Sequence, residues 1–576
     1  MKQQSFLKGA AVLTASTIVV KIIGMFYKIP LGNILGATGM AYFMAAYNIF
    51  NPIYALSVAG FPSAVSKMVA ESTAKRRYRD AKRIFRASFA LFVVTGFLGF
   101  SVMSLGAKPA AELIGSSGAY LSVAAMAPAI FFCCIISAYR GYYQGLGNMM
   151  PTAASQVIES FFKLVCGVTF AAFLLQQGMA GFDATGTVFG QPAGTRAEAA
   201  LLAMPRASAG AILGVTVSSV ISALYLAARH LAFGDGITRD MMKSSPKPQK
   251  TSAIIGRLVV FALPVCIGSI LTNITALIDV ATVMTRIGAA MDKGGDIIIA
   301  AHRGLIPPEI ARDAVPQYLF GAYSYCSSLF NLVPALTIPL GITALPLISS
   351  RWALGDRAKA GQIAQSVLKM SSLIAIPAGL GLCALAGPVL ELLYPARVQE
   401  AAIAAPILRS LGVGAVLVGV TAPVSSVFQA VGRADIPVKL MAVGAVLKTG
   451  VNYFLLAVPR FNINAAPYGT ILCYFFIFTA GLFLLQNTLR FQIDMASSFF
   501  KPLFCGIICA VSAFVSYEFF SRLFSARVSC LFSLVISGII YMIFVLFLKI
   551  ITKSEILLLP KGKKVAKILE KLLFLG

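Results

Sequence analysis

The sequence predicts an all-α, polytopic membrane protein with about fourteen transmembrane helices. Three observations favour this class: the composition, the spacing of the apolar runs and the placement of the positive charge. Of the 576 residues, 58% are hydrophobic and only 12% are charged, and the mean hydropathy is +0.84. Soluble domains carry about 25% charged residues, and a water-soluble fold cannot hide this much apolar surface. The same numbers exclude a disordered, collagen-like or disulfide-rich chain.

Apolar runs of about 20 residues predict membrane helices, because a helix of that length crosses the hydrocarbon core. The first run follows Lys2 and Lys8, as a signal peptide would, but Lys21 interrupts it and no small-residue cleavage site follows. We therefore expect a retained helix. The predicted spans are 10–31, 40–62, 84–106, 120–143, 152–175, 207–229, 253–277, 317–346, 364–388, 404–428, 438–458, 465–488, 499–521 and 527–549.

The chain has a net charge of +27. If the predicted spans alternate in direction across the membrane, most of this positive charge falls on one side. Segments on the same side as the N-terminus hold most of the Lys and Arg residues. The positive-inside rule then predicts that both termini are cytoplasmic. The charge is accounted for by topology, so anionic membrane lipids are its expected partners and nucleic acid is not.

Two loops of the chain carry the same short motif. It consists of Gln144, Gly147 and Pro151 between the fourth and fifth spans, and of Gln429, Gly432 and Pro437 between the tenth and eleventh. In each copy an intramembrane lysine, Lys163 or Lys448, follows the glutamine by nineteen residues. Repeats of this kind are typical of transporters that bind substrate between two halves.

The repeat predicts two pseudo-symmetric lobes of six helices each, with two extra helices after them. We expect a lobe over 1–235, a cytoplasmic linker over 236–252, a second lobe over 253–490, the extra helices over 491–550 and a basic, amphipathic cytoplasmic tail over 551–576.

Charged side chains inside the predicted spans are the candidate binding residues: Lys21, Lys28, Lys163, Lys448 and Glu159. A lysine at the bilayer centre costs about 2.5–3.5 kcal/mol on insertion scales. Lys28 is near the outer end of its span, where snorkelling relieves this cost. Lys163 is one turn from Glu159, which predicts an ion pair as the alternative to substrate binding. Unpaired lysines in a wet cavity suit an anionic solute such as a pyrophosphate, which lysine binds as a point charge.

The ten cysteines all lie in or beside apolar runs, and no C-x-x-C pair occurs. This usage is typical of small buried hydrophobic residues, so no metal and no cofactor is expected.

The pattern Lys21-Ile-Ile-Gly24 and the segment from Arg140 to Ala153, which holds the first motif, resemble the multidrug/oligosaccharidyl-lipid/polysaccharide exporter superfamily. The resemblance covers roughly residues 5–490. It points to the polysaccharide-transporter branch, typified by stage V sporulation protein B and by lipid II flippases. Arg140 joins the six motif residues as a candidate for gating.

This resemblance implies a bacterial cell-membrane flippase with two helical bundles around a cationic cavity. The implied substrate is an undecaprenyl-pyrophosphate-linked saccharide, such as lipid II or another wall or polysaccharide precursor, moved from the inner to the outer leaflet. Lys21 matches the basic residue of the family pattern basic-x-x-Gly. The chain departs from the pattern at Tyr27-Lys28, where lipid II flippases carry an Arg-Asp pair. We expect a monomer that alternates access, with an ion or the membrane potential as its driving force.

Three other functions compete with this hypothesis. A cation-coupled multidrug exporter of the same superfamily would need a carboxylate in the lobe interior, and here lysines outnumber acids in the spans. A membrane glycosyltransferase or acyltransferase would need a general base, and the first predicted outer loop, 32–39, has no charge. A non-transport role in sporulation or cell-wall assembly would leave the intramembrane lysines without a use. We therefore expect a transporter and not an enzyme.

Overall fold

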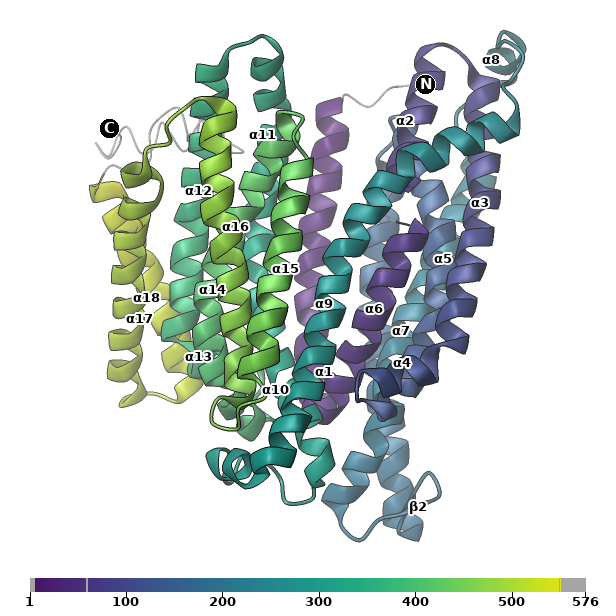
Figure 1. Cartoon of the computed structure of the whole chain (residues 1–576). Coiled ribbons are helices and arrows are strands. Elements are labelled where there is room, and N and C mark those ends of the chain that lie inside the picture. Colours follow the sequence, from purple (N-terminus) through teal and green to yellow (C-terminus); the bar gives the residue numbers. More distant parts are fainter. Residues whose placement is uncertain (1–5, 59–60, 549, 551–576) are drawn as a thin grey trace. The chain divides into compact units, whose positions relative to one another are not determined.

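The computed structural model describes residues 6–58, 61–548 and 550, and almost all of them are helical (Figure 1). The chain divides into two compact units. Unit 1 comprises Met1–Thr285 and Pro307–Gly321, and unit 2 comprises Arg286–Ile306 and Ala322–Gly576. The lobe limits expected from the sequence stay a prediction, and the predicted amphipathic tail over 551–576 lies outside the described residues.

Unit 1 contains most of the first half of the chain and one small hairpin. Two of its helices continue into unit 2. Its elements are α1 (Phe6–Val58), α2 (Phe61–Ala74), α3 (Tyr78–Leu105), α4 (Ala107–Leu113), η1 (Ser117–Ala119), α5 (Tyr120–Gly145), α6 (Met150–Thr185), β1 (Thr187–Val188), β2 (Gln191–Pro192), α7 (Arg196–Phe233), α8 (Arg239–Lys243), the first part of α9 (Thr251–Ala301), η2 (Arg312–Ala314) and the start of α10 (Val315–Phe330).

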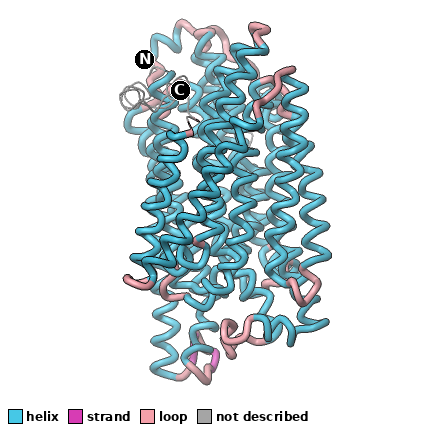
Figure 2. Tube along the Cα trace, turned by 90° about the vertical axis from the view of Figure 1, so that its left-hand side faces the viewer, coloured by secondary structure: helices cyan, strands magenta, loops and turns pink. Residues whose placement is uncertain are grey.

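All the regular secondary structure in the described residues of unit 2 is helical. After the ends of α9 and α10, its elements are α11 (Leu332–Ala353), α12 (Arg357–Ala384), α13 (Ala386–Leu393), α14 (Val398–Ala430), α15 (Asp435–Leu455), η3 (Asn462–Ala465), α16 (Ala466–Leu489), the π-helical η4 (Ala496–Phe500), α17 (Lys501–Ser521) and α18 (Ala526–Phe547). Within each unit the long helices run roughly parallel, with most loops at their ends (Figure 2).

Twelve helical segments of the described chain are long and apolar enough to cross a membrane, so the prediction of an all-α, multi-pass membrane protein is confirmed. The first segment, Ala15–Ala74, has 60 residues, or about 90 Å at 1.5 Å per residue. That is about three times the hydrocarbon thickness, and α1 breaks at Gly36, where φ is 60°. The segment therefore has room for two predicted spans. Together with the apolar start of α9, Thr251–Leu263, the helices are consistent with fourteen crossings.

Local sequence signals set the ends of α6 and α7, which extend past the other helices of unit 1 and carry the hairpin β1–β2 at their tip (Figure 1). Gly186 ends α6 in the left-handed conformation, which favours glycine. Thr195 caps α7 by accepting from the Glu198 amide at 3.1 Å, while the Glu198 carboxylate accepts from the Gly194 amide at 2.8 Å. This is a variant of the capping box.

Both copies of the repeated motif form the same turn. Gly147, between α5 and α6, has φ of 75°, and Gly432, between α14 and α15, has φ of 79°. The amide after each glycine donates to the carbonyl five residues earlier, at 3.0 Å in the first copy and 2.9 Å in the second. Pro151 and Pro437 then fall in the first turn of the following helix. The shared turn is a Schellman-type helix end, so the two copies have one backbone conformation.

Helices α6 and α7 approach closely because glycines face each other. A Cβ atom on Gly214 would overlap the backbone of Gly167, and one on Gly210 would lie 2.8 Å from the Phe170 carbonyl oxygen. Small residues spaced four apart commonly allow such close packing between membrane helices.

We predict that Gly214→Ala lowers the stability of the purified protein, by at least the about 1–3 kcal/mol typical of overpacking. The facing atoms are backbone and cannot rotate away. Thermal unfolding in detergent measures the change. Gly256→Ala is the matched control, because a Cβ atom there meets nothing within 4 Å. Equal unfolding temperatures for the two variants would contradict the close packing.

Candidate functional site

Three of the predicted lysines lie near one another in unit 1. Lys21 and Lys28 are seven residues apart on α1 and so share one helix face, and Lys163 is on α6, which packs against α1. The charges of both Lys163 and Lys21 act on Lys28. Lys21 is exposed, whereas Lys28 and Lys163 are half-buried. The three ammonium groups therefore form a cationic cluster.

Gly24 lies on the same face of α1, between Lys21 and Lys28. A Cβ atom on Gly24 would have no atom of the described chain within 4 Å. The α1 face between the two lysines thus borders open space.

Aromatic rings hold the Lys163 ammonium group. It lies 4.9 Å from the centre of the Tyr47 ring and 5.3 Å from that of Tyr27. Tyr27 is only 2% exposed, and its hydroxyl donates to the Ala211 carbonyl of α7 at 3.1 Å. Cation–π contacts of this kind favour the charged form of lysine where water is scarce.

Glu159 is paired with Arg140 of α5. Arg140 Nη2 and Glu159 Oε2 are 2.8 Å apart, and Arg140 Nε donates to Ser155 Oγ at 2.9 Å. The side chains are 18% and 28% exposed, respectively. Among the described residues, Lys163 has no carboxylate within ion-pair distance. The alternative pairing of Lys163 with Glu159 is therefore not the one observed.

Tyr47 contributes a second polar group. Its hydroxyl oxygen is buried and has no hydrogen-bond partner among the described residues. A buried hydroxyl without a partner normally carries a desolvation penalty. Tyr47 therefore offers a donor to a ligand that reaches Lys163.

The other predicted site residues lie elsewhere. Lys448 is half-buried on α15 of unit 2, and its part in binding stays a prediction. Gln144 lies in the last turn of α5 and Gln429 in that of α14, next to the shared glycine turns. Their part in gating, and that of Arg140, also stays a prediction.

Sequence reasoning missed the aromatic residues and the partner of Arg140. The sequence does contain a signal for the aromatic residues, because aromatic side chains follow one stripe of α1, at Phe43, Tyr47, Phe50 and Tyr54. The pairing of Arg140 with Glu159 follows from the tight turn at Gly147, which brings the end of α5 beside the start of α6.

Two family models match separate parts of the chain. The one described as "Polysaccharide biosynthesis protein" matches residues 6–191, and the one described as "Lipid II flippase MurJ" matches residues 314–554. Two curated relatives come from Bacillus subtilis (strain 168). Lipid II flippase MurJ is 24% identical over 77% of this chain and 76% of its own length, and stage V sporulation protein B is 23% identical over 97% and 98%.

Solved structures share the fold. The inward closed conformation of lipid II flippase MurJ has a TM-score of 0.61 at 14% identity, over 93% of this chain and 98% of that one. An inward-facing multidrug resistance MATE family transporter of the MOP superfamily has a TM-score of 0.58 at 14% identity, over 83% and 99%. The chain is therefore similar to polysaccharide biosynthesis proteins and to the lipid II flippase MurJ, and it shares its fold with transporters of the multidrug/oligosaccharidyl-lipid/polysaccharide (MOP) exporter superfamily. The similarity to the lipid II flippase MurJ in both sequence and fold supports the prediction of a transporter and not an enzyme.

We predict that Arg140 and Glu159 are energetically coupled. A double-mutant cycle built from Arg140→Gln, Glu159→Gln and the double variant should give a coupling free energy of about 1–3 kcal/mol. This is less than the 3–5 kcal/mol lost when a fully buried pair is broken, because both side chains are partly exposed. Thermal or denaturant unfolding measures the cycle.

The control cycle uses Arg196 and Asp183, which are 3.6 Å apart and 73% and 52% exposed. The coupling free energy of this exposed pair should be about 0–1 kcal/mol. Equal coupling in the two cycles would show that Arg140 and Glu159 are no stronger a pair than one on the surface.

Proposed function

We propose that this protein flips an undecaprenyl-pyrophosphate-linked saccharide from the inner to the outer leaflet of the bacterial cell membrane. The observation that carries the proposal is the cationic cluster of Lys21, Lys28 and Lys163, whose neighbouring carboxylate, Glu159, is already paired with Arg140. The names of the matched families and relatives, polysaccharide biosynthesis protein and lipid II flippase, support a lipid-linked saccharide as the substrate class.

Charge balance favours an anionic headgroup. Four basic groups and one acidic group make up the cluster and the Arg140–Glu159 pair, so the region keeps a surplus of positive charge. Each unpaired lysine near the bilayer centre costs about 2.5–3.5 kcal/mol on insertion scales. A bound diphosphate would offset this cost, and the Tyr47 hydroxyl would donate to one of its oxygens.

A cationic drug fits the same site poorly. A cation-coupled multidrug exporter needs a carboxylate in the lobe interior. Glu159 is held at 2.8 Å by Arg140, and the three lysines would repel a cation. The multidrug alternative is therefore disfavoured by the observed pairing.

The proposed cycle is alternating access. In the state open to the cytoplasm, the diphosphate enters beside Lys21 and reaches Lys28 and Lys163, while the polyprenyl chain stays in lipid. The membrane potential is a suitable driving force, because each negative charge moved outward gains about 2.3 kcal/mol per 100 mV when the inside is negative.

We predict that Lys163→Gln lowers the rate of flipping at least tenfold in proteoliposomes loaded with a fluorescent polyprenyl-pyrophosphate saccharide. Lys163→Arg should keep most of the rate, because the positive charge over the Tyr47 ring remains. Lys243→Gln, a change of the same kind on α8, should leave the rate unchanged. Full activity of the Lys163→Gln protein at equal insertion would refute the role of the cluster.

A second variant tests the open space without altering charge. Gly24→Leu should fold, since nothing lies within 4 Å of the added Cβ atom and leucine favours a helix more than glycine does. We expect it to reduce flipping at least tenfold by filling the path beside Lys21 and Lys28. If this variant flips normally, the open space faces acyl chains and not the substrate.

A further inference from the structure

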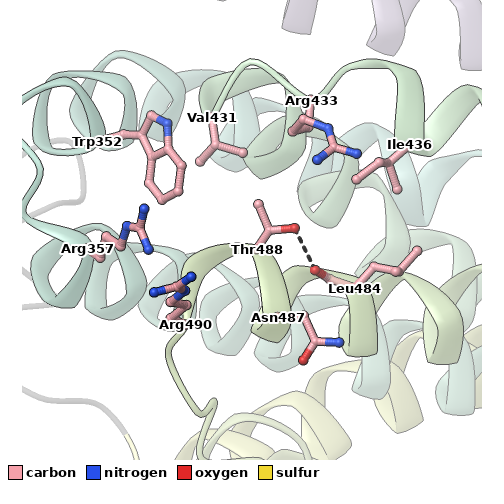
Figure 3. A pocket seen from close by; sticks show the side chains of 9 residues that line it. All are labelled: Trp352, Arg357, Val431, Arg433, Ile436, Leu484, Asn487, Thr488 and Arg490. Atoms are coloured by element: carbon pink, nitrogen blue, oxygen red, sulfur yellow. Dashed lines mark hydrogen bonds between the residues drawn. The ribbon is translucent and has the colours of Figure 1, made fainter.

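A pocket of about 440 Å³ lies entirely within unit 2, at the ends of α11, α14 and α16 and the start of α12 and α15 (Figure 3). Its nine described lining residues include three arginines and no carboxylate. They are Trp352, Arg357, Val431, Arg433, Ile436, Leu484, Asn487, Thr488 and Arg490. The charge distribution of the sequence predicts that this end of the helices faces the cytoplasm.

Two of the three guanidinium groups are not neutralised. Within the described chain, neither Arg357 nor Arg490 has a carboxylate at ion-pair distance. Arg433 contacts Asp435 at 3.2 Å, but Asp435 is shared with a lysine at 2.9 Å. Figure 3 shows Arg357 and Arg490 directed toward the pocket from neighbouring segments, near the Trp352 ring. The pocket therefore holds a positive potential.

The backbone at Arg490 points to a use for its side chain. Arg490 caps α16 in the left-handed conformation, with φ of 50° and ψ of 43°. Glycine normally takes this position, because it has no Cβ atom to strain. The chain instead places a guanidinium group there, at the edge of the pocket.

The corresponding corner of unit 1 supplies an internal comparison. Helix α3 matches α12 in the repeat, and both have 28 residues. The basic residues that start α3 are covered by the segment that follows α7. Arg79 Nε donates to the Met242 carbonyl at 2.8 Å, Arg83 Nη1 donates to the Gln249 carbonyl at 2.9 Å, and Lys82 contacts Asp235 at 3.6 Å.

No such cover lies over the start of α12 in the described part of unit 2. The chain after α16 packs deeper along the helix. Phe491 contacts Gly361, and the Asp494 amide donates to Gln365 at 3.3 Å. Arg357, one turn before Gly361, is left exposed. Arg357 instead lies over the Trp352 ring, 5.4 Å from its centre, and its guanidinium group stays accessible to a molecule outside the chain.

We propose that this pocket binds a phosphate-bearing anion, through the guanidinium groups of Arg357, Arg433 and Arg490. Arginine forms paired hydrogen bonds with phosphate oxygens. Asn487 and Thr488 add amide and hydroxyl groups at the same wall. The phosphate comes either from an anionic lipid headgroup or from a free anion. This site is independent of the lysine cluster, so its test is separate from that of the proposed function.

The chain provides a reporter, because Trp352 is its single tryptophan and lines the pocket. Fluorescence of the full-length protein would be measured in two arms. In detergent, inorganic phosphate is titrated against chloride at equal ionic strength. In nanodiscs, phosphatidylcholine alone is compared with mixtures containing increasing phosphatidylglycerol.

We expect a saturable change in at least one arm, and the arm identifies the source of the phosphate. Arg357→Gln and Arg490→Gly should each weaken binding about tenfold or more. The glycine variant suits the left-handed backbone, so it removes the guanidinium group without straining the fold. Arg351→Gln is the matched control, because Arg351 is an exposed arginine in the last turn of α11 that does not line the pocket.

Three outcomes would overturn the proposal. The first is the absence of a saturable change in either arm. The second is unchanged affinity in both pocket variants. The third is an equal loss in the Arg351→Gln control, which would show that only the general surface charge matters.

Discussion

The ion pair between Arg140 and Glu159 determines how unit 1 carries charge. A carboxylate one turn from Lys163 would neutralise that lysine if it were available. At 2.8 Å from Arg140, Glu159 is instead held toward α5, and Lys163 is stabilised by two tyrosine rings. Rings stabilise a cation without cancelling its charge. Among the described residues, the lysine cluster thus has no carboxylate of its own in a region where positive charge is costly, and the proposed choice of an anionic passenger follows from this.

The sequence predicted the parts that depend on local pattern. Apolar runs and placed charges were sufficient for the membrane fold, and the intramembrane lysines were found because they interrupt those runs. The partner of Glu159 was not predicted, because Lys163 is near it in sequence while Arg140 is near it only through the turn at Gly147. The tyrosine contacts were missed for a similar reason, since an aromatic residue in an apolar helix is normally a packing residue.

The two copies of the repeated motif share one backbone turn, but their surroundings differ. Both turns are closed by a left-handed glycine and the same pattern of amide donors. In unit 1 the neighbouring basic residues are satisfied by the linker, whereas in unit 2 the following chain takes a different route past Gly361. The two corners thus share one turn geometry and differ in how their basic residues are contacted.

The close contact of α6 with α7 has a consequence for motion. With only hydrogen atoms between the backbones at Gly167 and Gly214, the two helices have no soft layer of side chains across which to slide. Tyr27 ties α1 to the same pair through the Ala211 carbonyl. Lys28 and Lys163 are thereby mounted on a single stiff frame. In the proposed transport cycle, a tilt of this frame would preserve the spacing of the charges, and the proposed passenger would travel with its anchor instead of being handed from one residue to the next.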